Sequence, residues 1–378
     1  MDIFTSEHVR EVALSGIRVY NALARETPGC IPLTIGEPDF NTPDCIKNAA
    51  KAALDNNFTH YPPNNGEEFL RQAISDFERE RNGFDYSPDE VVVTVGATGA
   101  IFTALVGIIN PGDEIIVPTP AYVLYENVVK LCGGVFVPMD TAADGFQITP
   151  ERLSRAATHR TKAIILNSPN NPTGCILNEE SLQAVYDFAK ERDIFVICDD
   201  VYSQLVYDKG YKSFAAYSEL KDKILLVQSF SKPYAMTGWR VGYLCAEKSV
   251  LQQLQKVHQN STSSIVSFVQ SACVTALSAD VSEMRETYRA RRDFIYSRLT
   301  QMGFEVYRPE GAFYIFPSIE KFKMDSGTFS QRLITEGGVG TIPSSCFGSE
   351  GFIRLSYCYS QAELEEGLSR IERFIGTL

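Results

Sequence analysis

The middle of the chain alternates short apolar segments with helical patterns, and this alternation constrains the fold more than any other feature. The segments are apolar at consecutive positions and span residues 91–95, 114–118, 135–139, 162–167, 194–200, 224–230 and 241–247. Strands that are apolar on both faces and joined by helices are typical of a mostly parallel sheet with helices packed on both sides. The predicted fold class is therefore α/β, with a large domain built on this sheet.

The two ends of the chain follow a different pattern. Residues 1–40 predict a short helix and an extended segment. Residues 280–378 predict a long charged helix, strands within 306–317 and 352–358, and a final helix that begins near 361. We expect both ends to form one smaller α+β domain. The expected boundaries are 1–40 for an N-terminal arm and part of the small domain, 41–279 for the large domain, and 280–378 for the rest of the small domain.

Charge and cysteine content argue against several classes of protein. The 378 residues carry 47 acidic and 35 basic side chains, a net charge of −12, and an acidic surface repels nucleic-acid phosphates. The nine cysteines form no C-x-x-C pair, so we expect reduced thiols rather than disulfides or a metal site. The longest near-apolar run, 97–109, is shorter than the roughly 18 residues of a membrane span. Without an apolar leader segment, the expected location is the cytoplasm.

Four loops should lie at the ligand-binding edge of the sheet, because ligands in such sheets bind beyond the carboxyl ends of the strands. Each loop follows one of the apolar segments. The loops are GATG (96–99), SPNNPTG (168–174), CDDVYSQ (198–204) and SFSKPYAMTGWRVG (229–242). Taken singly, each is also compatible with an ordinary turn, a helix cap or a solvated side chain.

Side chains in these loops match the needs of one cofactor. GATG opens a helix whose free N–H groups attract an anion, and Thr98 adds a hydroxyl donor. Desolvation, or a nearby cation such as Arg240, would lower the pKa of Lys232 and make its amine nucleophilic toward a carbonyl. Asp199, at the end of a buried strand, needs a partner such as a protonated ring nitrogen, and Tyr202 can bond a ring oxygen. These groups together indicate pyridoxal 5'-phosphate.

In combination, the motifs resemble those of the class I aminotransferases, which belong to the pyridoxal phosphate fold-type I superfamily. The resemblance covers about Ile31 to Ile375 and is strongest to the subgroup that contains bacterial N-acetyl-diaminopimelate and aromatic aminotransferases. The motifs that carry it are TIGEPDF, HYPPNNG, VGATGA, PAYVLY, SPNNPTG, CDDVY, SFSKPYAMTGWRVG, GAFYIFP and FIRLSY.

The resemblance implies a role for each residue that matches a family motif. Lys232 is the lysine expected to form the Schiff base with the cofactor, and Asp199 is expected to pair with the pyridine nitrogen. Tyr202 and Asn171 should hold the ring hydroxyl oxygen, and Tyr122 should stack on the ring face. The residues expected to bind the phosphate are Ala97 through its backbone, Thr98, Ser229, Arg240 and, with a weaker claim, Ser231.

Further expectations concern the substrate and a second subunit. Arg354 should hold the substrate α-carboxylate as a bidentate pair, with Asn171 and the Gly36 backbone assisting. Tyr61 should reach the phosphate in a neighbouring subunit, so the resemblance implies a homodimer with shared active sites.

The chain departs from the family pattern at two positions. Asp199-Asp200 stands where relatives often have Asp-Glu, and the first position is intact. Thr98 stands where some aspartate-specific relatives carry a lysine, which weakens the interpretation as a dedicated aspartate aminotransferase. Arg18, in SGIRVY, is then a candidate to bind a distal substrate carboxylate, and the alternative is a solvated helix arginine.

The resemblance therefore implies an aminotransferase that moves an amino group between an L-amino acid and a 2-oxo acid, with 2-oxoglutarate as the expected acceptor. The expected donor is N-acetyl-L,L-diaminopimelate or an aromatic amino acid, and alanine and aspartate stay open. A pyridoxal phosphate-dependent carbon–sulfur β-lyase is the alternative, because it would share nearly every cofactor contact. A cofactor-sensing transcription regulator is disfavoured, since we expect no DNA-binding domain before Ile31.

Overall fold

A seven-stranded sheet forms the centre of the computed structural model, which describes residues 5–208 and 210–378. Its strands run in the order β2-β8-β7-β6-β5-β3-β4. Their bounds are β2 (Val91–Thr94), β3 (Glu114–Thr119), β4 (Val135–Asp140), β5 (Thr161–Asn167), β6 (Phe195–Asp199), β7 (Ile224–Ser229) and β8 (Gly242–Cys245). Of these seven strands, β8 alone runs in the opposite direction to the other six. The predicted α/β fold with a mostly parallel sheet is confirmed.

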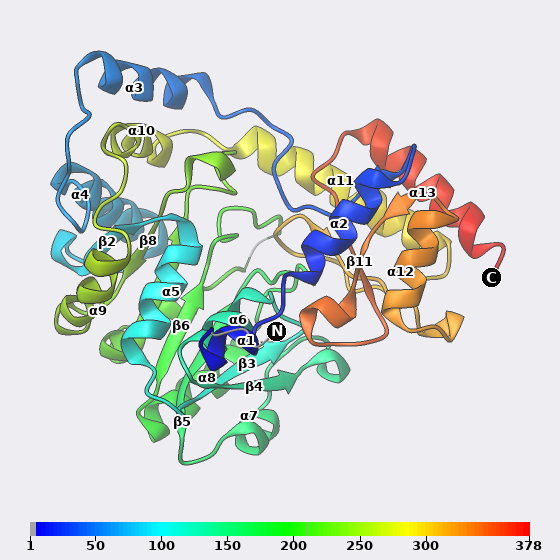
Figure 1. The fold of residues 1–378 in the computed structure, drawn as a ribbon, viewed down its shortest axis with the longest axis horizontal. Coiled ribbons are helices and arrows are strands. Elements are labelled where there is room, and N and C mark those ends of the chain that lie inside the picture. Colours follow the sequence, from blue (N-terminus) through cyan, green and yellow to red (C-terminus); the bar gives the residue numbers. More distant parts are fainter. Residues whose placement is uncertain (1–4, 209) are drawn as a thin grey trace.

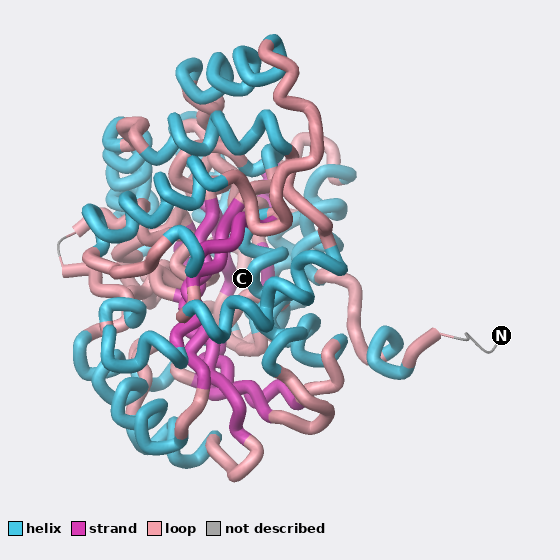
Figure 2. The backbone as a smooth tube through the Cα atoms, turned by 90° about the vertical axis from the view of Figure 1, so that its left-hand side faces the viewer, coloured by secondary structure: helices cyan, strands magenta, loops and turns pink. Residues whose placement is uncertain are grey.

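Helices cover both faces of the sheet, which explains why its inner strands are apolar on consecutive positions. Along β2, Val92 packs into the apolar cluster of one face, and Val91 and Val93 pack into the cluster of the other. Helices α5 (Gly96–Ile108), α6 (Leu124–Leu131) and α9 (Lys248–Ser261) contribute to the first cluster. Helices on the second face are α3 (Asp44–Asp55), α4 (Glu68–Phe77), α8 (Glu179–Arg192) and α10 (Ser267–Leu277). Figure 2 shows the strands enclosed between helices.

Segments from the two ends of the chain lie side by side, as predicted. Strand β1 (Ile31–Pro32) pairs in parallel with β10 (Val339–Gly340). A second small sheet has the order β11-β12-β9, formed by β11 (Ile342–Pro343), β12 (Ile353–Ser356) and β9 (Tyr314–Ile315). Figure 1 shows α2 (Gly16–Glu26) beside the late helices, which are α11 (Ser282–Gln301), α12 (Ser326–Thr335) and α13 (Gln361–Ile375). The division into two domains, with its boundaries at residues 40 and 279, stays a prediction.

The strand expected within 306–317 is much shorter than the apolar pattern indicated. Only β9 is regular strand, and Val306 and Pro317 meet in an isolated bridge. Pro309 and Gly311 explain the difference, because proline removes a ladder donor and glycine weakens a strand interior. Gly311 also packs so closely on Pro169 that a Cβ there would lie 2.5 Å from the proline ring.

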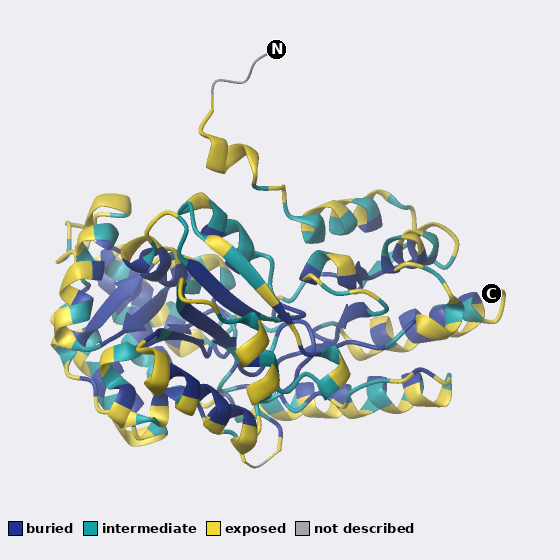
Figure 3. Cartoon of the chain, turned by 90° about the horizontal axis from the view of Figure 1, so that it is seen from below, coloured by how far each residue is buried: buried dark blue, intermediate teal, exposed yellow. Residues whose placement is uncertain are grey.

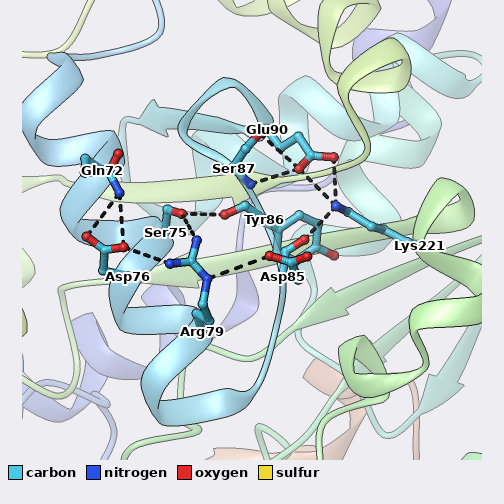
Figure 4. A network of polar contacts seen from close by, with 9 residues as sticks. All are labelled: Gln72, Ser75, Asp76, Arg79, Asp85, Tyr86, Ser87, Glu90 and Lys221. Atoms are coloured by element: carbon cyan, nitrogen blue, oxygen red, sulfur yellow. Dashed lines mark hydrogen bonds and ion pairs between the residues drawn. The ribbon is translucent and has the colours of Figure 1, made fainter.

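A polar network fixes helix α4 to the start of strand β2 (Figure 4). Buried Glu90 accepts hydrogen bonds from the backbone N–H and the hydroxyl of Ser87, and its carboxylate pairs with Lys221 at 2.9 Å. Arg79 donates to Ser75, whose hydroxyl donates in turn to the Tyr86 carbonyl. These contacts fix the segment just before the edge strand β2. Helix α5 follows that strand directly in the chain.

Two expectations from composition can be compared with the described residues. All nine cysteines are free, and five of them are buried, as expected for reduced structural thiols. Among the helices of residues 5–208 and 210–378, none is both long and apolar enough to cross a membrane.

Candidate active site

A cavity of ≈ 610 Å³ opens at the carboxyl ends of β5, β6 and β7, and at the start of helix α5. Nearly all the residues singled out from the sequence line it. They are Arg18, Gly36, Ala97, Thr98, Tyr122, Asn171, Asp199, Tyr202, Ser229, Ser231, Lys232, Arg240 and Arg354. Segments more than 300 residues apart in the sequence therefore meet at the sheet edge where ligands of such folds bind.

Lys232 follows β7 and presents its amine to this cavity. Its Nζ donates a hydrogen bond to the Gly36 carbonyl at 2.7 Å. Burial lowers the pKa of the amine from 10.5 to about 8, and the charges of Arg354 and Arg240 act in the same direction. A large part of the Lys232 population is therefore neutral and nucleophilic slightly above neutral pH.

The backbone near Lys232 leaves room for glycine alone at position 36. A Cβ on Gly36 would lie 1.8 Å from the Tyr314 hydroxyl oxygen. A side chain at position 36 would therefore push on Tyr314 or shift this backbone, whose carbonyl is the partner of Lys232.

Asp199 ends strand β6 and is 4% exposed. Its Oδ2 accepts a hydrogen bond from the Tyr125 hydroxyl at 2.6 Å, and its Oδ1 has no partner among the described residues. Burial raises the pKa of this carboxyl from 3.8 to about 6, against the lowering effect of the Tyr125 hydrogen bond. A buried, unpaired carboxylate oxygen fits a cationic N–H donor such as a protonated pyridine nitrogen.

The first turn of α5 and the segment after β7 form one wall of the cavity. Gly96 has φ +63°, and a Cβ there would lie 2.9 Å from the Arg240 guanidinium. Arg240 itself has φ +57° and donates to the Thr237 carbonyl at 3.0 Å. Free N–H groups at a helix start, the hydroxyls of Thr98 and Ser229, and the Arg240 guanidinium suit a phosphate dianion. A non-glycine residue held in the left-handed region is typical of such sites.

Arg354, on β12, is a buried cation without a carboxylate partner among the described residues. It is 2% exposed, donates to the Asn171 side-chain oxygen at 2.9 Å and to the Thr34 carbonyl, and leaves its Nε without a partner. Removing a guanidinium from water requires compensation by an anion. A carboxylate ligand in the cavity would supply the anion that Arg354 lacks among the described residues.

Tyrosines surround the space between Asp199 and Arg354. The Tyr202 hydroxyl shares a hydrogen bond of 2.9 Å with the Tyr314 hydroxyl. Tyr122 packs edge-on against Tyr125, with ring centroids 6.1 Å apart. Burial raises the pKa of the Tyr122 phenol, and the charge of Arg354 opposes that shift. All of these phenols stay protonated near neutral pH and can donate to a ligand oxygen.

One expected residue lies elsewhere, and several residues of the cavity were not singled out. Tyr61 is 94% exposed and does not line this cavity, which agrees with a role toward another subunit but does not test it. Tyr125 and Tyr314 lie within the motifs PAYVLY and GAFYIFP. The motifs therefore placed both tyrosines near the site, but the sequence did not predict their hydrogen bonds to Asp199 and Tyr202. The remaining wall comes from α2, including Asn21 and Arg25.

Known proteins match this chain along nearly its whole length. A family model described as aminotransferase class I and II matches residues 28–371. The probable N-acetyl-LL-diaminopimelate aminotransferase of Bacillus subtilis is 42% identical over 381 residues, covering 99% of this chain and 96% of that protein. Aromatic-amino-acid aminotransferase 2 of Thermococcus litoralis is 38% identical, with 98% of both chains covered. The solved aspartate aminotransferase of Thermus thermophilus with maleate has a TM-score of 0.94 at 37% identity, covering 98% of this chain and 100% of that one.

Proposed function

Because this chain belongs to the class I and II aminotransferases and is therefore a transaminase, we propose that it uses pyridoxal phosphate to move an amino group from an L-amino acid to 2-oxoglutarate. The family predicted from the motifs is confirmed, and pyridoxal phosphate is the cofactor of that family. The observation that carries the proposal is the meeting of Lys232, Asp199 and Arg354 in one cavity.

The residues of the cavity fit this cofactor. The unpaired Oδ1 of Asp199 suits the protonated ring nitrogen, and Tyr202 with Asn171 would hold the ring hydroxyl oxygen. The start of α5, Ser229 and Arg240 would hold the phosphate, with Ser231 beside them and Tyr122 against the ring face. When bound, the cofactor supplies an electron sink for the charge that develops at the substrate α-carbon.

The chain's own side chains would perform three tasks in the reaction. Lys232 would hold the cofactor through its amine and, once free, carry the proton to and from the substrate α-carbon. Its lowered pKa suits this task, because a base near neutral pH must be able to lose its proton. Arg354 would bind the substrate α-carboxylate and thereby fix the direction of the bond that is broken.

Two kinds of donor remain candidates for this site. The Bacillus subtilis relative is named for N-acetyl-LL-diaminopimelate and the Thermococcus litoralis relative for aromatic amino acids. Arg18 on the cavity wall supports a donor with a distal carboxylate, and Ile17, Ile101 and Leu124 supply apolar surface for a ring. Both Arg18 and the apolar surface are compatible with 2-oxoglutarate as the acceptor. The second carboxylate of 2-oxoglutarate could pair with Arg18.

The carbon–sulfur β-lyase alternative is not favoured. Its cofactor contacts would be nearly the same, so the fold alone does not separate the two reactions. The matching family model and the three reported relatives are all named for amino transfer.

We also propose that the chain works as a homodimer with shared active sites. Tyr61 and Leu14 are 94% and 93% exposed, and Val266 is 52% exposed. No residue of the N-terminal helix α1 (Glu7–Arg10) is buried, as Figure 3 shows. Large exposed apolar side chains of this kind support an interface with a second copy.

A donor panel tests the proposed reaction. Purified protein with pyridoxal phosphate and 2-oxoglutarate is offered single L-amino acids and N-acetyl-L,L-diaminopimelate, and glutamate formation is measured. Strong turnover with one or two donors is the expected result. Pyruvate from sulfur amino acids, with no glutamate from any donor, would instead establish the lyase.

A further inference from the structure

Tyr314 contacts both parts of the proposed active site, the part for the substrate carboxylate and the part for the cofactor. It lies on β9, lines the cavity and is 2% exposed. One neighbour is Arg354, the proposed partner of the carboxylate, and another is Tyr202, a proposed partner of the ring oxygen. Tyr314 is thus placed between the two ligand-binding parts of the cavity.

The pairing of two short strands brings Tyr314 to Arg354. In the antiparallel ladder between β9 and β12, Tyr314 stands opposite Ser356. Arg354 lies two residues before Ser356, and alternate residues of a strand point to the same face of the sheet. Long side chains at diagonal positions of one face can reach each other, and the Tyr314 ring and the Arg354 guanidinium do so.

The Arg354 guanidinium lies close to two aromatic rings. Its central carbon is 4.5 Å from the centroid of the Tyr314 ring and 5.0 Å from that of the Phe347 ring. A cation within about 6 Å of a ring centroid is attracted by the π electrons, most strongly where water is excluded, and all three side chains are buried. The rings restrict Arg354 before any carboxylate binds, which reduces the entropy that binding costs.

The Tyr314 hydroxyl has one hydrogen-bond partner among the described residues, the Tyr202 hydroxyl at 2.9 Å. Burial raises the pKa of both phenols, so each keeps its single proton near neutral pH. If Tyr202 donates its proton to a ligand oxygen, the bond between the two hydroxyls persists only with Tyr314 as the donor. Tyr314 can therefore complete a chain of two hydrogen bonds that ends on the ring oxygen.

Close packing keeps the Tyr314 hydroxyl in this position. A Cβ on Gly36 would lie 1.8 Å from the Tyr314 oxygen, so glycine backbone occupies the space beside it. The rings of Tyr314 and Tyr202 also pack edge-on, with centroids 5.7 Å apart and an interplanar angle of 84°. The hydroxyl therefore has little freedom to turn toward another acceptor.

We propose that Tyr314 is a positioning residue with two separable tasks. Its ring holds the Arg354 guanidinium in the orientation that binds the substrate carboxylate. Its hydroxyl donates to Tyr202, so that Tyr202 donates to the ring oxygen of the cofactor. This inference rests on the proposed function and goes beyond it, because it assigns the support of both binding sites to one residue outside the set that holds the ligands.

Tyr314→Phe tests the hydroxyl, because it keeps the ring. A hydrogen bond donated to the ring oxygen favours the anionic form of that oxygen, and loss of the second donor in the chain weakens the bond. The pH at which the visible absorbance of the bound cofactor changes should therefore rise by roughly half a unit. The affinity for succinate, an unreactive dicarboxylate, should change less than about twofold when measured by calorimetry.

Tyr314→Leu removes the ring as well. Arg354 then becomes ordered only when the carboxylate binds, so succinate should bind about fivefold more weakly, in addition to the rise in the transition pH. Phe347→Leu is the matched control for the ring, since Phe347 also lies at the guanidinium and has no hydroxyl. It should weaken succinate binding to a similar extent and leave the transition pH unchanged.

Tyr357→Phe is the matched control for the hydroxyl. Tyr357 is fully buried, donates to the Ala312 carbonyl at 3.3 Å and does not line the cavity, so its variant should leave both readouts unchanged. An unchanged transition pH in Tyr314→Phe, or an equal rise in Tyr357→Phe, would overturn the proposal. Equally weak succinate binding in Tyr314→Phe and Tyr314→Leu, or undiminished binding in Tyr314→Leu, would overturn it as well.

The same measurements separate this inference from the proposed function. A protein that takes up no pyridoxal phosphate would contradict the proposed function, and succinate binding to the cofactor-free variants would still decide on the task of the ring. Normal amino transfer, with none of these changes in the Tyr314 variants, would contradict the inference alone. Absence of succinate binding to the parent protein would contradict the carboxylate site at Arg354, and the inference would fall with it.

Discussion

Lys232 and Asp199 face one cavity, and burial shifts each toward its neutral form. The pKa of Lys232 falls to about 8, and that of Asp199 rises to about 6. Desolvation is the largest cause in both cases, since a charged group is costly in a poorly solvated site. The lysine gains nucleophilicity near neutral pH, and the carboxylate gains affinity for a cationic ligand. Burial alone thus prepares the lysine for an aldehyde and the carboxylate for a protonated ring nitrogen.

The lowered pKa of Lys232 predicts how the cofactor-free protein should react with pyridoxal phosphate. Below pH 8 the neutral amine fraction, and with it the reaction rate, should fall about tenfold per pH unit. Above about pH 8 the rate should level off, because the amine is already neutral. Rapid-mixing absorbance measurements across this range provide the test. A rate that keeps rising until the ordinary lysine pKa of 10.5 would contradict the shift.

Arg354→Gln should separate substrate binding from cofactor binding. Loss of the guanidinium removes a charge-assisted partner for the α-carboxylate, so kcat/KM for donor and acceptor should fall about a hundredfold. The visible absorbance of the bound cofactor should remain, because Arg354 holds no cofactor atom in the proposed arrangement. Arg298→Gln serves as control, because Arg298 lies outside the cavity and pairs with Glu372 of α13. Loss of the absorbance together with activity would assign Arg354 to the cofactor instead.

At the scale of elements, the apolar segments predicted the strands of the large sheet to within one or two residues. Segment 224–230 became β7 (Ile224–Ser229), and segment 194–200 became β6 (Phe195–Asp199). Continuous burial on both faces gives these strands a strong local signal. The run 312–316 is equally apolar, yet only β9 within it is regular strand, because its pairing depends on β12, some 40 residues away.

The sequence predicted which residues form the site better than it predicted the hydrogen bonds between them. Tyr125 reaches Asp199 across 74 residues of sequence, and Tyr202 reaches Tyr314 across 112. Such pairs depend on how whole elements pack. The spacing of Arg18 and Arg25 is visible in the sequence, but the face they share meets the cavity only because α2 packs on β10 and β11.

The network around Glu90 gives a prediction about how β2 is anchored (Figure 4). Glu90→Ala removes two hydrogen bonds to Ser87 and the partly exposed ion pair with Lys221, so the free energy of unfolding should fall by about 1–2 kcal/mol. Urea unfolding of the cofactor-loaded protein measures this. Glu219→Ala, which removes an exposed hydrogen bond from Tyr186 and an exposed pair with Lys190, should cause no measurable change. Equal stability of the two variants would show that the Glu90 network is not an anchor.

At the scale of the whole molecule, the proposed homodimer with Tyr61 at the partner's cavity predicts that a second copy completes each active site. Lys232→Ala and Tyr61→Ala proteins should each have low activity as purified dimers. When their subunits are mixed and exchanged, hybrid dimers contain one site with both residues intact, so activity should recover. Sedimentation analysis checks that dimers exist. No recovery after proven subunit exchange would contradict shared sites.

The most direct test of the account is to locate the amine that holds the cofactor. Protein loaded with pyridoxal phosphate is reduced with borohydride, which fixes the linkage between the aldehyde and an amine, and its peptides are analysed by mass spectrometry. The account predicts one added cofactor per chain, on the peptide that contains Lys232, and none on that peptide in Lys232→Ala. Stoichiometric attachment at another lysine, or unchanged attachment in Lys232→Ala, would contradict the assignment of this cavity as the active site.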